Sequence, residues 1–235
     1  MTETITDKNP DETLNVVLVL DRSASMRCIR QSTISAVNSI LDKQRKEAGS
    51  DTTLISLYLF ADTVERVWGD VPADHVPDLS RENYAPNGNT RLLDAIATAI
   101  TETTQRLKPG KPESPSKTDL EPDEVLIVIT TDGIENRSRG YDFTAVRELI
   151  RQKTVVNWEF NWHGPNERSR KYALGLGILP ENFNFFEVTE EGILKTCDKI
   201  SSDIRRKKKN KSTSGRKDDP ATIPETLKNT QRPTQ

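Results

Sequence analysis

The sequence predicts an α/β fold: a doubly wound, Rossmann-like sheet of six strands, mostly parallel with one antiparallel edge strand, and helices on both faces. Continuous aliphatic runs at 16–20 and 125–129 are typical of strands buried on both faces, as in a parallel sheet covered by helices. Around these runs, strand-like segments alternate with segments whose apolar residues recur at helical spacing. That alternation is the pattern of parallel strands joined by crossover helices.

Each helix or strand is predicted from the spacing of its apolar residues and from the glycine, proline and polar residues at its ends. Besides the two runs above, strands are expected at 53–60, 64–68, 154–162 and 182–188. The strand at 64–68 alternates in polarity, which favours an antiparallel edge strand. Helices are expected at 28–47, 92–107, 143–152, 167–177 and 190–206.

Two proline-containing segments interrupt this order. Residues 69–89 should hold short helical turns at most, and they are either a specificity surface or a plain connection. Residues 108–123 should be a flexible insertion and no domain boundary, because the strand that follows them is needed to complete the candidate site described below.

Composition limits the folded part of the chain. The 235 residues are 33% hydrophobic with a mean hydropathy of -0.68, which is low for a fully packed protein. From Arg205 onward ten Lys and Arg residues stand against three acids, although the whole chain has a formal net charge of -2. We therefore expect one folded domain at 13–206, between a disordered segment at 1–12 and a disordered basic tail at 207–235.

Cysteine usage and hydropathy bear on the compartment. Cys28 and Cys197 are far apart in sequence, and free thiols in a reducing compartment are favoured over a disulfide between the first and last helices. No run approaches the roughly 18 apolar residues of a membrane span, and residues 1–12 lack the apolar core of a secretory signal. The sequence thus predicts a cytoplasmic protein with no membrane contact.

Oxygen-bearing side chains follow the two central strands. Asp21, Ser23 and Ser25 stand at alternate positions after the first strand, and Asp132 follows the second buried strand. Thr90 lies on a glycine-containing loop just before a helix. Ligands in open α/β sheets bind beyond the carboxyl ends of the strands, and hard cations such as Mg²⁺ take oxygen ligands. Taken alone, the two serines could equally be helix caps.

In this order, Asp21-x-Ser23-x-Ser25, Thr90 and Asp132-Gly133 resemble the metal-ion-dependent adhesion site of the von Willebrand factor type A domain. The resemblance covers about residues 14–204, and the sequence around the five residues is similar to stand-alone bacterial and phage members, although Asn89 stands where many members have a second glycine. It implies that Ser23, Ser25 and Thr90 offer hydroxyls to a metal ion. Asp21 and Asp132 would then act directly or through water, on neighbouring strands beneath the Thr90 loop.

The resemblance implies a protein–protein interaction module that is no enzyme. Mg²⁺ or Mn²⁺ would be held by the five residues, and a partner protein would complete the coordination with an Asp or Glu. Such a partner would be an AAA-type ATPase or another subunit of a complex. The alternative is a Mg²⁺-dependent phosphohydrolase of the haloacid-dehalogenase type, whose first strand ends in Asp-x-Asp. Here Ser23 occupies the place of the second Asp, and a hydroxyl is too weak an acid for that role.

Two further features could bind ligands. His163 follows the strand predicted at 154–162, but without a second His or Cys at ligand spacing a hydrogen-bonded loop histidine is favoured over a zinc site. The run from Arg205 to Lys209 could attract nucleic acid or an acidic surface, but a solvated tail is favoured.

Overall fold

A computed structural model describes residues 13–47, 52–107 and 124–214. It confirms the predicted class: six strands form one sheet in the order β3-β2-β1-β4-β5-β6, with only β3 antiparallel to its neighbour. The strands are β1 (Thr13–Asp21), β2 (Thr52–Phe60), β3 (Val64–Pro72), β4 (Glu124–Thr130), β5 (Glu159–Gly164) and β6 (Phe183–Phe185). The helices are η2 (Ala24–Ile29), α1 (Arg30–Glu47), α2 (Leu92–Arg106), α3 (Phe143–Val155), α4 (Glu167–Gly175), η3 (Pro180–Asn182) and α5 (Glu190–Ser214).

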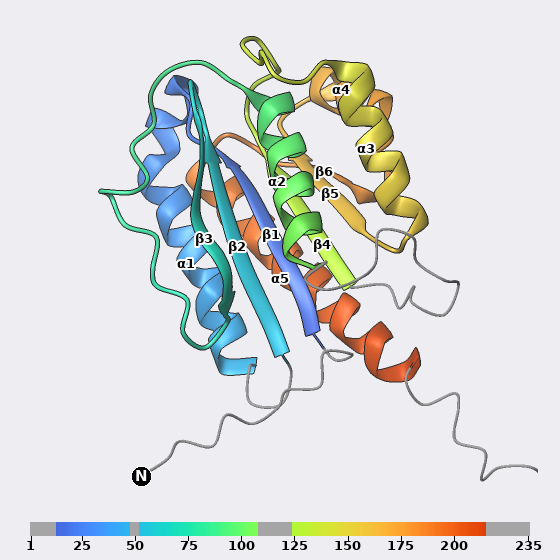
Figure 1. Cartoon of the computed structure of the whole chain (residues 1–235). Coiled ribbons are helices and arrows are strands. Elements are labelled where there is room, and N and C mark those ends of the chain that lie inside the picture. The colour runs from blue at the N-terminus through green and yellow to red at the C-terminus, as the bar shows by residue number, and fades with distance from the viewer. Residues whose placement is uncertain (1–12, 48–51, 108–123, 215–235) are drawn as a thin grey trace, which may run out of the picture.

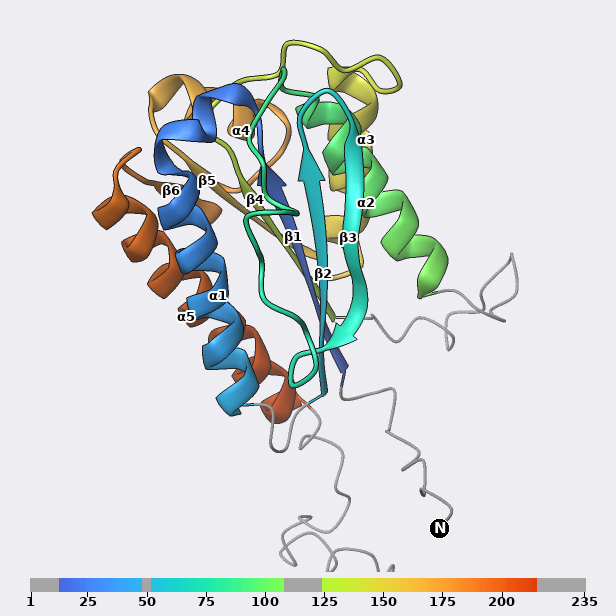
Figure 2. The same cartoon turned by 90° about the vertical axis from the view of Figure 1, so that its left-hand side faces the viewer.

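Helices cover both faces of the sheet, with α1 and α5 on one side and α2 and α3 on the other (Figures 1 and 2). The aliphatic run of β1 explains this arrangement, because side chains alternate between the faces of a strand. Leu18 and Leu20 belong to the core beneath α1 and α5, and Val17 and Val19 belong to the core beneath α2 and α3. Because both faces of this strand are apolar, both are removed from water only when helices cover both faces of the sheet.

The central pair of strands fixes the position of the polar residues. β1 pairs in parallel with β4, from Leu14 opposite Glu124 to Leu20 opposite Thr130. The carboxyl ends of β1 and β4 therefore lie side by side at one end of the sheet. This register brings Asp21 and Asp132 to the same end of the sheet.

Several boundaries differ from the prediction, among them that of β6, which spans only Phe183–Phe185 where a strand was expected at 182–188. The strand expected at 154–162 begins only at Glu159, because α3 runs on to Val155 and a turn follows in which the amide of Trp158 donates to the carbonyl of Lys153. Asn157 in this turn has a positive φ of 65°, a conformation that Asn tolerates better than most residues. The edge strand β3 is also longer than expected and ends at Pro72.

The last helix corrects the predicted tail. α5 continues to Ser214, so residues 207–214 are helical, and only residues 215–235 of the expected tail lie outside the described residues, as do residues 1–12 and 108–123. Much of the basic run is in contact with the domain: Arg205 pairs with Glu47 at 2.6 Å, and Arg206 pairs with Glu159. The Nζ of Lys207, a residue only 6% exposed, donates to the carbonyl of Asn157 at 3.1 Å.

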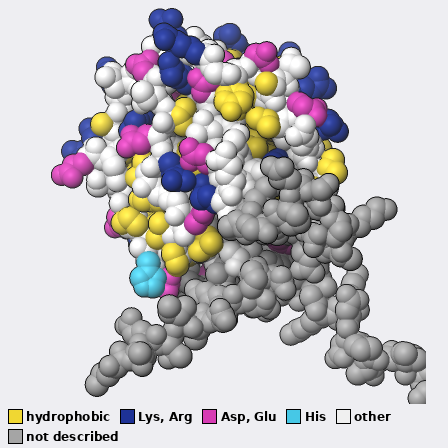
Figure 3. Space-filling view, in the orientation of Figure 1, with side chains coloured by type: hydrophobic (Ala, Val, Ile, Leu, Met, Phe, Trp, Pro, Cys, Tyr) yellow, Lys and Arg dark blue, Asp and Glu magenta, His cyan; other side chains and the backbone are white. Residues whose placement is uncertain are grey.

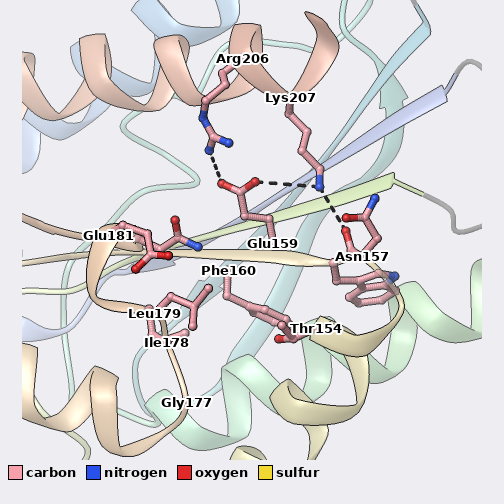
Figure 4. A pocket seen from close by; sticks show the side chains of 12 residues that line it. Thr154, Asn157, Glu159, Phe160, Gly177, Ile178, Leu179, Glu181, Arg206 and Lys207 are labelled. Atoms are coloured by element: carbon pink, nitrogen blue, oxygen red, sulfur yellow. Dashed lines mark hydrogen bonds and ion pairs between the residues drawn. The ribbon is translucent and has the colours of Figure 1, made fainter. Parts of the chain in front are cut away.

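Glu159, Arg206 and Lys207 also line a pocket of about 330 Å³ between α5 and the ends of α3 and β5 (Figure 4). Of its four charged lining residues, Arg206 and Lys207 each form an ion pair with Glu159, and the fourth is Glu181. No helix in the described ranges is both long enough and apolar enough to cross a membrane. Cys28 is exposed, Cys197 is buried, and both are free thiols.

Candidate metal centre

Asp21 is the most buried member of the predicted site. Its side chain is 0% exposed, and Oδ1 accepts the backbone amide of Ser23 at 2.6 Å while Oδ2 accepts the hydroxyl of Thr131 at 2.7 Å. The backbone carbonyl of Asp21 accepts the hydroxyl of the buried Tyr84 at 2.8 Å. Burial raises the pKa of Asp21 to about 6, against the opposing effect of these hydrogen bonds, because removal from water disfavours the charged carboxylate.

The two serines face the site and not the helix that follows them. Ser23 occupies the position before η2, yet its side chain makes no capping hydrogen bond. Its Oγ lies 3.1 Å from the Oγ of Ser25, which donates to Oδ1 of Asp132 at 2.7 Å. Capping by Ser23, the simpler of the two interpretations, is therefore wrong for η2. The two hydroxyls form a chain from the end of β1 to the end of β4.

Thr90 is brought to the same place by the loop before α2. Its amide donates to Oδ1 of Asn136 at 2.9 Å, and the amide of Asn136 donates back to the carbonyl of Thr90 at 3.2 Å. A Cβ placed on Gly133 would lie 3.4 Å from Oγ1 of Thr90 and 3.8 Å from Oδ2 of Asp21. The hydroxyl and the carboxylate thus face one small space, which is open because residue 133 has no side chain.

The structure also shows residues that position the site and that the sequence analysis did not assign. The carboxylate of Glu135 accepts the amide of Leu93 at 2.8 Å and the hydroxyl of Ser138 at 2.6 Å. Asp94 accepts three successive amides, those of residues 139, 140 and 141, at 2.9–3.0 Å. These two carboxylates fasten the loop after β4 to the first turn of α2. Their sequence signal was only that both are acids within the two stretches that carry Thr90 and Asp132.

The donor set fits a hard divalent cation. Two carboxylates and three hydroxyls converge without any nitrogen or sulfur ligand, which is the chemistry of Mg²⁺ or Mn²⁺ more than of Zn²⁺. Within the described ranges no group of three or more His, Cys, Asp or Glu side chains is arranged to hold a metal, so an ion here would rely on the hydroxyls. Burial also raises the pKa of Asp132, and a nearby cation would stabilise both carboxylates in the charged form.

His163 differs from its prediction. It lies within β5 and not in a loop, it is 1% exposed, and neither ring nitrogen has a hydrogen-bond partner in the described part of the chain. Burial, with a smaller effect of Lys199, lowers the pKa of His163 to about 3, so the ring is neutral at pH 7. The hydrogen-bonded loop histidine predicted from the sequence is therefore a buried, neutral strand residue.

Comparison with known proteins bears on the fold. No protein-family model and no curated protein matches the sequence. Among solved structures, the minor pilin PilB from Streptococcus sanguinis matches 84% of this chain with a TM-score of 0.57 and 15% identity, and this chain spans only 62% of PilB. The vWF domain of the type V pili tip protein Mfa5 from Porphyromonas gingivalis matches 83% with a TM-score of 0.58 and 10% identity, over 95% of its own length.

A third match is to a metal-loaded protein. The manganese-loaded TRAP protein from Plasmodium vivax matches 78% of this chain with a TM-score of 0.50 and 16% identity, and 72% of that protein is covered. At such identities the likeness shows the shared fold and not a shared partner.

Proposed function

Because this chain has the fold of a von Willebrand factor type A domain, we propose that it is a metal-dependent protein–protein interaction module. One observation carries the proposal: Asp21, Ser23, Ser25, Thr90 and Asp132, from three distant segments, converge on the space beside Gly133. In this proposal they hold one Mg²⁺ or Mn²⁺. The manganese-loaded TRAP protein, which has the same fold, supports the binding of a divalent ion by a protein of this fold.

The charge of the site favours an acidic partner. Two carboxylates at most offset a divalent charge, and either can act through water, so the ion keeps an electrostatic preference for one more anion. Ser25 is exposed whereas Asp21 and Thr90 are buried, so the ion would be reached from the side of Ser25. We propose that a partner protein supplies an Asp or Glu there. An AAA-type ATPase or another complex subunit is the partner that the resemblance suggests.

The phosphohydrolase alternative lacks its general acid. Ser23 stands where that chemistry needs a carboxylic acid, and its hydroxyl is engaged with Ser25. The nearest other acid in the site, Asp132, accepts the hydroxyl of Ser25 and belongs to the ligand set. We therefore propose a binding role with no turnover.

The test is capture of partners by the immobilised protein in Mn²⁺ and in EDTA, with Thr90→Ala beside wild type. Thr144→Ala, an exposed threonine in the first turn of α3, is the matched control. We expect one set of proteins to be retained by wild type and Thr144→Ala in Mn²⁺ only, and to be lost with Thr90→Ala. Retention of the same proteins by folded Thr90→Ala in EDTA would overturn the proposal, as would hydrolysis of phosphate esters that Asp21→Asn abolishes.

A further inference from the structure

Three arginines lie within two residues of Ser25, Thr90 or Asn136, on the segments that form the candidate metal site. We propose that these residues, Arg27, Arg91 and Arg137, form an arginine rim that selects a partner segment bearing several carboxylates, one for the metal and others for the rim. This inference rests on the proposed function, because the rim acts on a partner that the metal holds.

Arg27 lies on the η2 side of the site, two residues after Ser25. Its Nε donates to the carbonyl of Pro86 at 3.2 Å, and its Nη2 donates to Oδ1 of Asn87 at 2.5 Å. Both acceptors are neutral, so the exposed guanidinium is held in place with its charge uncompensated. The contact also fixes it beside the loop that leads to Thr90.

Arg91 and Arg137 lie on the other side. Arg91 directly follows Thr90, and Arg137 directly follows Asn136, whose amide and side chain are bound to Thr90. Both guanidiniums help to lower the pKa of Asp62, after the larger effect of its hydrogen bonds from Asn89, which places the two charges around one exposed carboxylate.

No described carboxylate forms a salt bridge with any of the three arginines. By contrast, Arg22, which follows Asp21, is paired with Glu65 at 2.8 Å and is already compensated. Figure 3 shows Lys and Arg side chains along the upper margin of the molecule, interspersed with acidic ones, at the end to which the arrow of β1 points in Figure 2. Arg27 is thus held in place without a salt bridge, and Arg91 and Arg137 add positive charge on the other side of the site, where the exposed Asp62 offsets part of it.

These charges affect the metal and the partner in opposite directions. Positive groups repel a divalent ion, so the rim weakens metal binding to the protein alone. The same groups attract an acidic segment that binds the ion. The rim would therefore couple the binding of the metal to the binding of the partner. The partner's carboxylates offset the repulsion between the rim and the ion, and the ion adds its own attraction for those carboxylates. A role in folding alone would not produce effects of opposite sign.

The experiment uses two fluorescein-labelled peptides, Gly-Ser-Glu-Ser-Gly and Glu-Ser-Glu-Ser-Glu, and measures fluorescence anisotropy in Mn²⁺. The proteins are wild type, Arg27→Gln, Arg91→Gln and Arg137→Gln, with Lys46→Gln as the control. Lys46 is exposed in the last turn of α1, at the far end of that helix from the site. Mn²⁺ affinity without peptide is measured in parallel by electron paramagnetic resonance.

We expect the triply acidic peptide to bind more tightly than the singly acidic one at low salt, with the advantage shrinking as salt screens the charges. Each rim substitution should weaken the acidic peptide about two- to five-fold, the range of an exposed ion pair, and should change the single-Glu peptide less. Without peptide, each should leave Mn²⁺ affinity unchanged or raise it by about two- to three-fold. Lys46→Gln should change neither.

Each contrary result has a separate meaning. Equal Mn²⁺-dependent affinity of wild type for the two peptides would overturn the arginine rim and leave the metal-dependent module standing. Absence of Mn²⁺-dependent binding of either peptide, or equal binding in EDTA, would overturn the proposed function and the rim with it. Loss of Mn²⁺ affinity in the rim variants would show a structural role and also overturn the inference.

Discussion

Replacing Asp21 by Asn should stabilise the metal-free protein while abolishing its response to metal. The carboxylate lies beneath the protein surface, and burial raises its pKa from 3.8 to about 6. Above pH 6 the folded protein therefore carries the negative charge of Asp21 in a buried place. The same charge costs less free energy in the unfolded chain, where water solvates it. Asn keeps the shape of the side chain and removes the charge.

The size of the effect follows from that shift. A difference of about two pKa units corresponds to about 3 kcal/mol of unfolding free energy, lost as the pH rises from 3.8 through 6. Asn can still accept the amide of Ser23, and Thr131 can turn to accept from the new NH₂ group, but these bonds become weaker without the charge. A net gain of about 1–2 kcal/mol at pH 7.5 should raise Tm by about 3–6 °C.

The assay is thermal unfolding by circular dichroism at pH 7.5, in EDTA and in Mn²⁺. Wild type should gain about 2.7 kcal/mol when Mn²⁺ is at about 100 times its Kd, and Asp21→Asn should gain nothing, so the order of the two melting temperatures should reverse. Asp94→Asn is the control, because Asp94 accepts three backbone amides that one amide oxygen cannot all satisfy. It should be destabilised by about 2 kcal/mol in both buffers.

Two results would refute this reasoning. If Asp21→Asn melted well below wild type in EDTA, as Asp94→Asn should, the buried charge would be stabilising and the raised pKa would be the wrong description of the site. If the variant gained as much stability from Mn²⁺ as wild type, the ion would be bound elsewhere.

Gly133→Ala should shift Tm by only about 2 °C, since the new methyl is at ordinary contact distance from Thr90, yet it should lower Mn²⁺ affinity at least about tenfold by titration calorimetry. His163→Leu should make the free energy of unfolding less sensitive to acid, because below about pH 6.5 the histidine takes up a proton in the unfolded state and not in the folded state. In urea unfolding at pH 7 and 5, wild type should therefore lose about 1.4 kcal/mol of unfolding free energy per pH unit relative to the variant. Lys207→Ala should cost about 1–2 kcal/mol in the same assay, because it deletes a buried amine and its hydrogen bond, whereas the exposed Lys171→Ala should stay within about 0.5 kcal/mol.

The sheet was predictable because its signals are local. The aliphatic runs of β1 and β4, each followed within three residues by an aspartate, identify two central strands without any knowledge of what covers them. The five site residues followed from their order along the chain and from a family resemblance. Their convergence is a property of the structure, and their role as metal ligands stays a prediction.

What the sequence did not predict depends on contacts between distant segments. The run from Arg205 to Lys209 has the composition of a solvated tail, and only its contacts with Glu47, Asn157 and Glu159 explain why it is helical. Val155 suits a strand by its branching, yet α3 includes it. Asp94 and Glu135 lie in stretches that carry the family resemblance, but they had no assigned role until the amides that they accept were known.

The parallel pairing of β1 with β4 has a consequence for folding kinetics. Thr131 and Asp21, whose side chains touch, are 110 positions apart, so a long loop must close before the complete site can exist. A partly folded chain that had formed only the β1, β2 and β3 portion of the sheet would contain Asp21, Ser23 and Ser25, but neither Asp132 nor the contacts of Asn136 that position Thr90. Manganese added during refolding should therefore accelerate no early step, and its paramagnetic signal should change only when the last central strand docks.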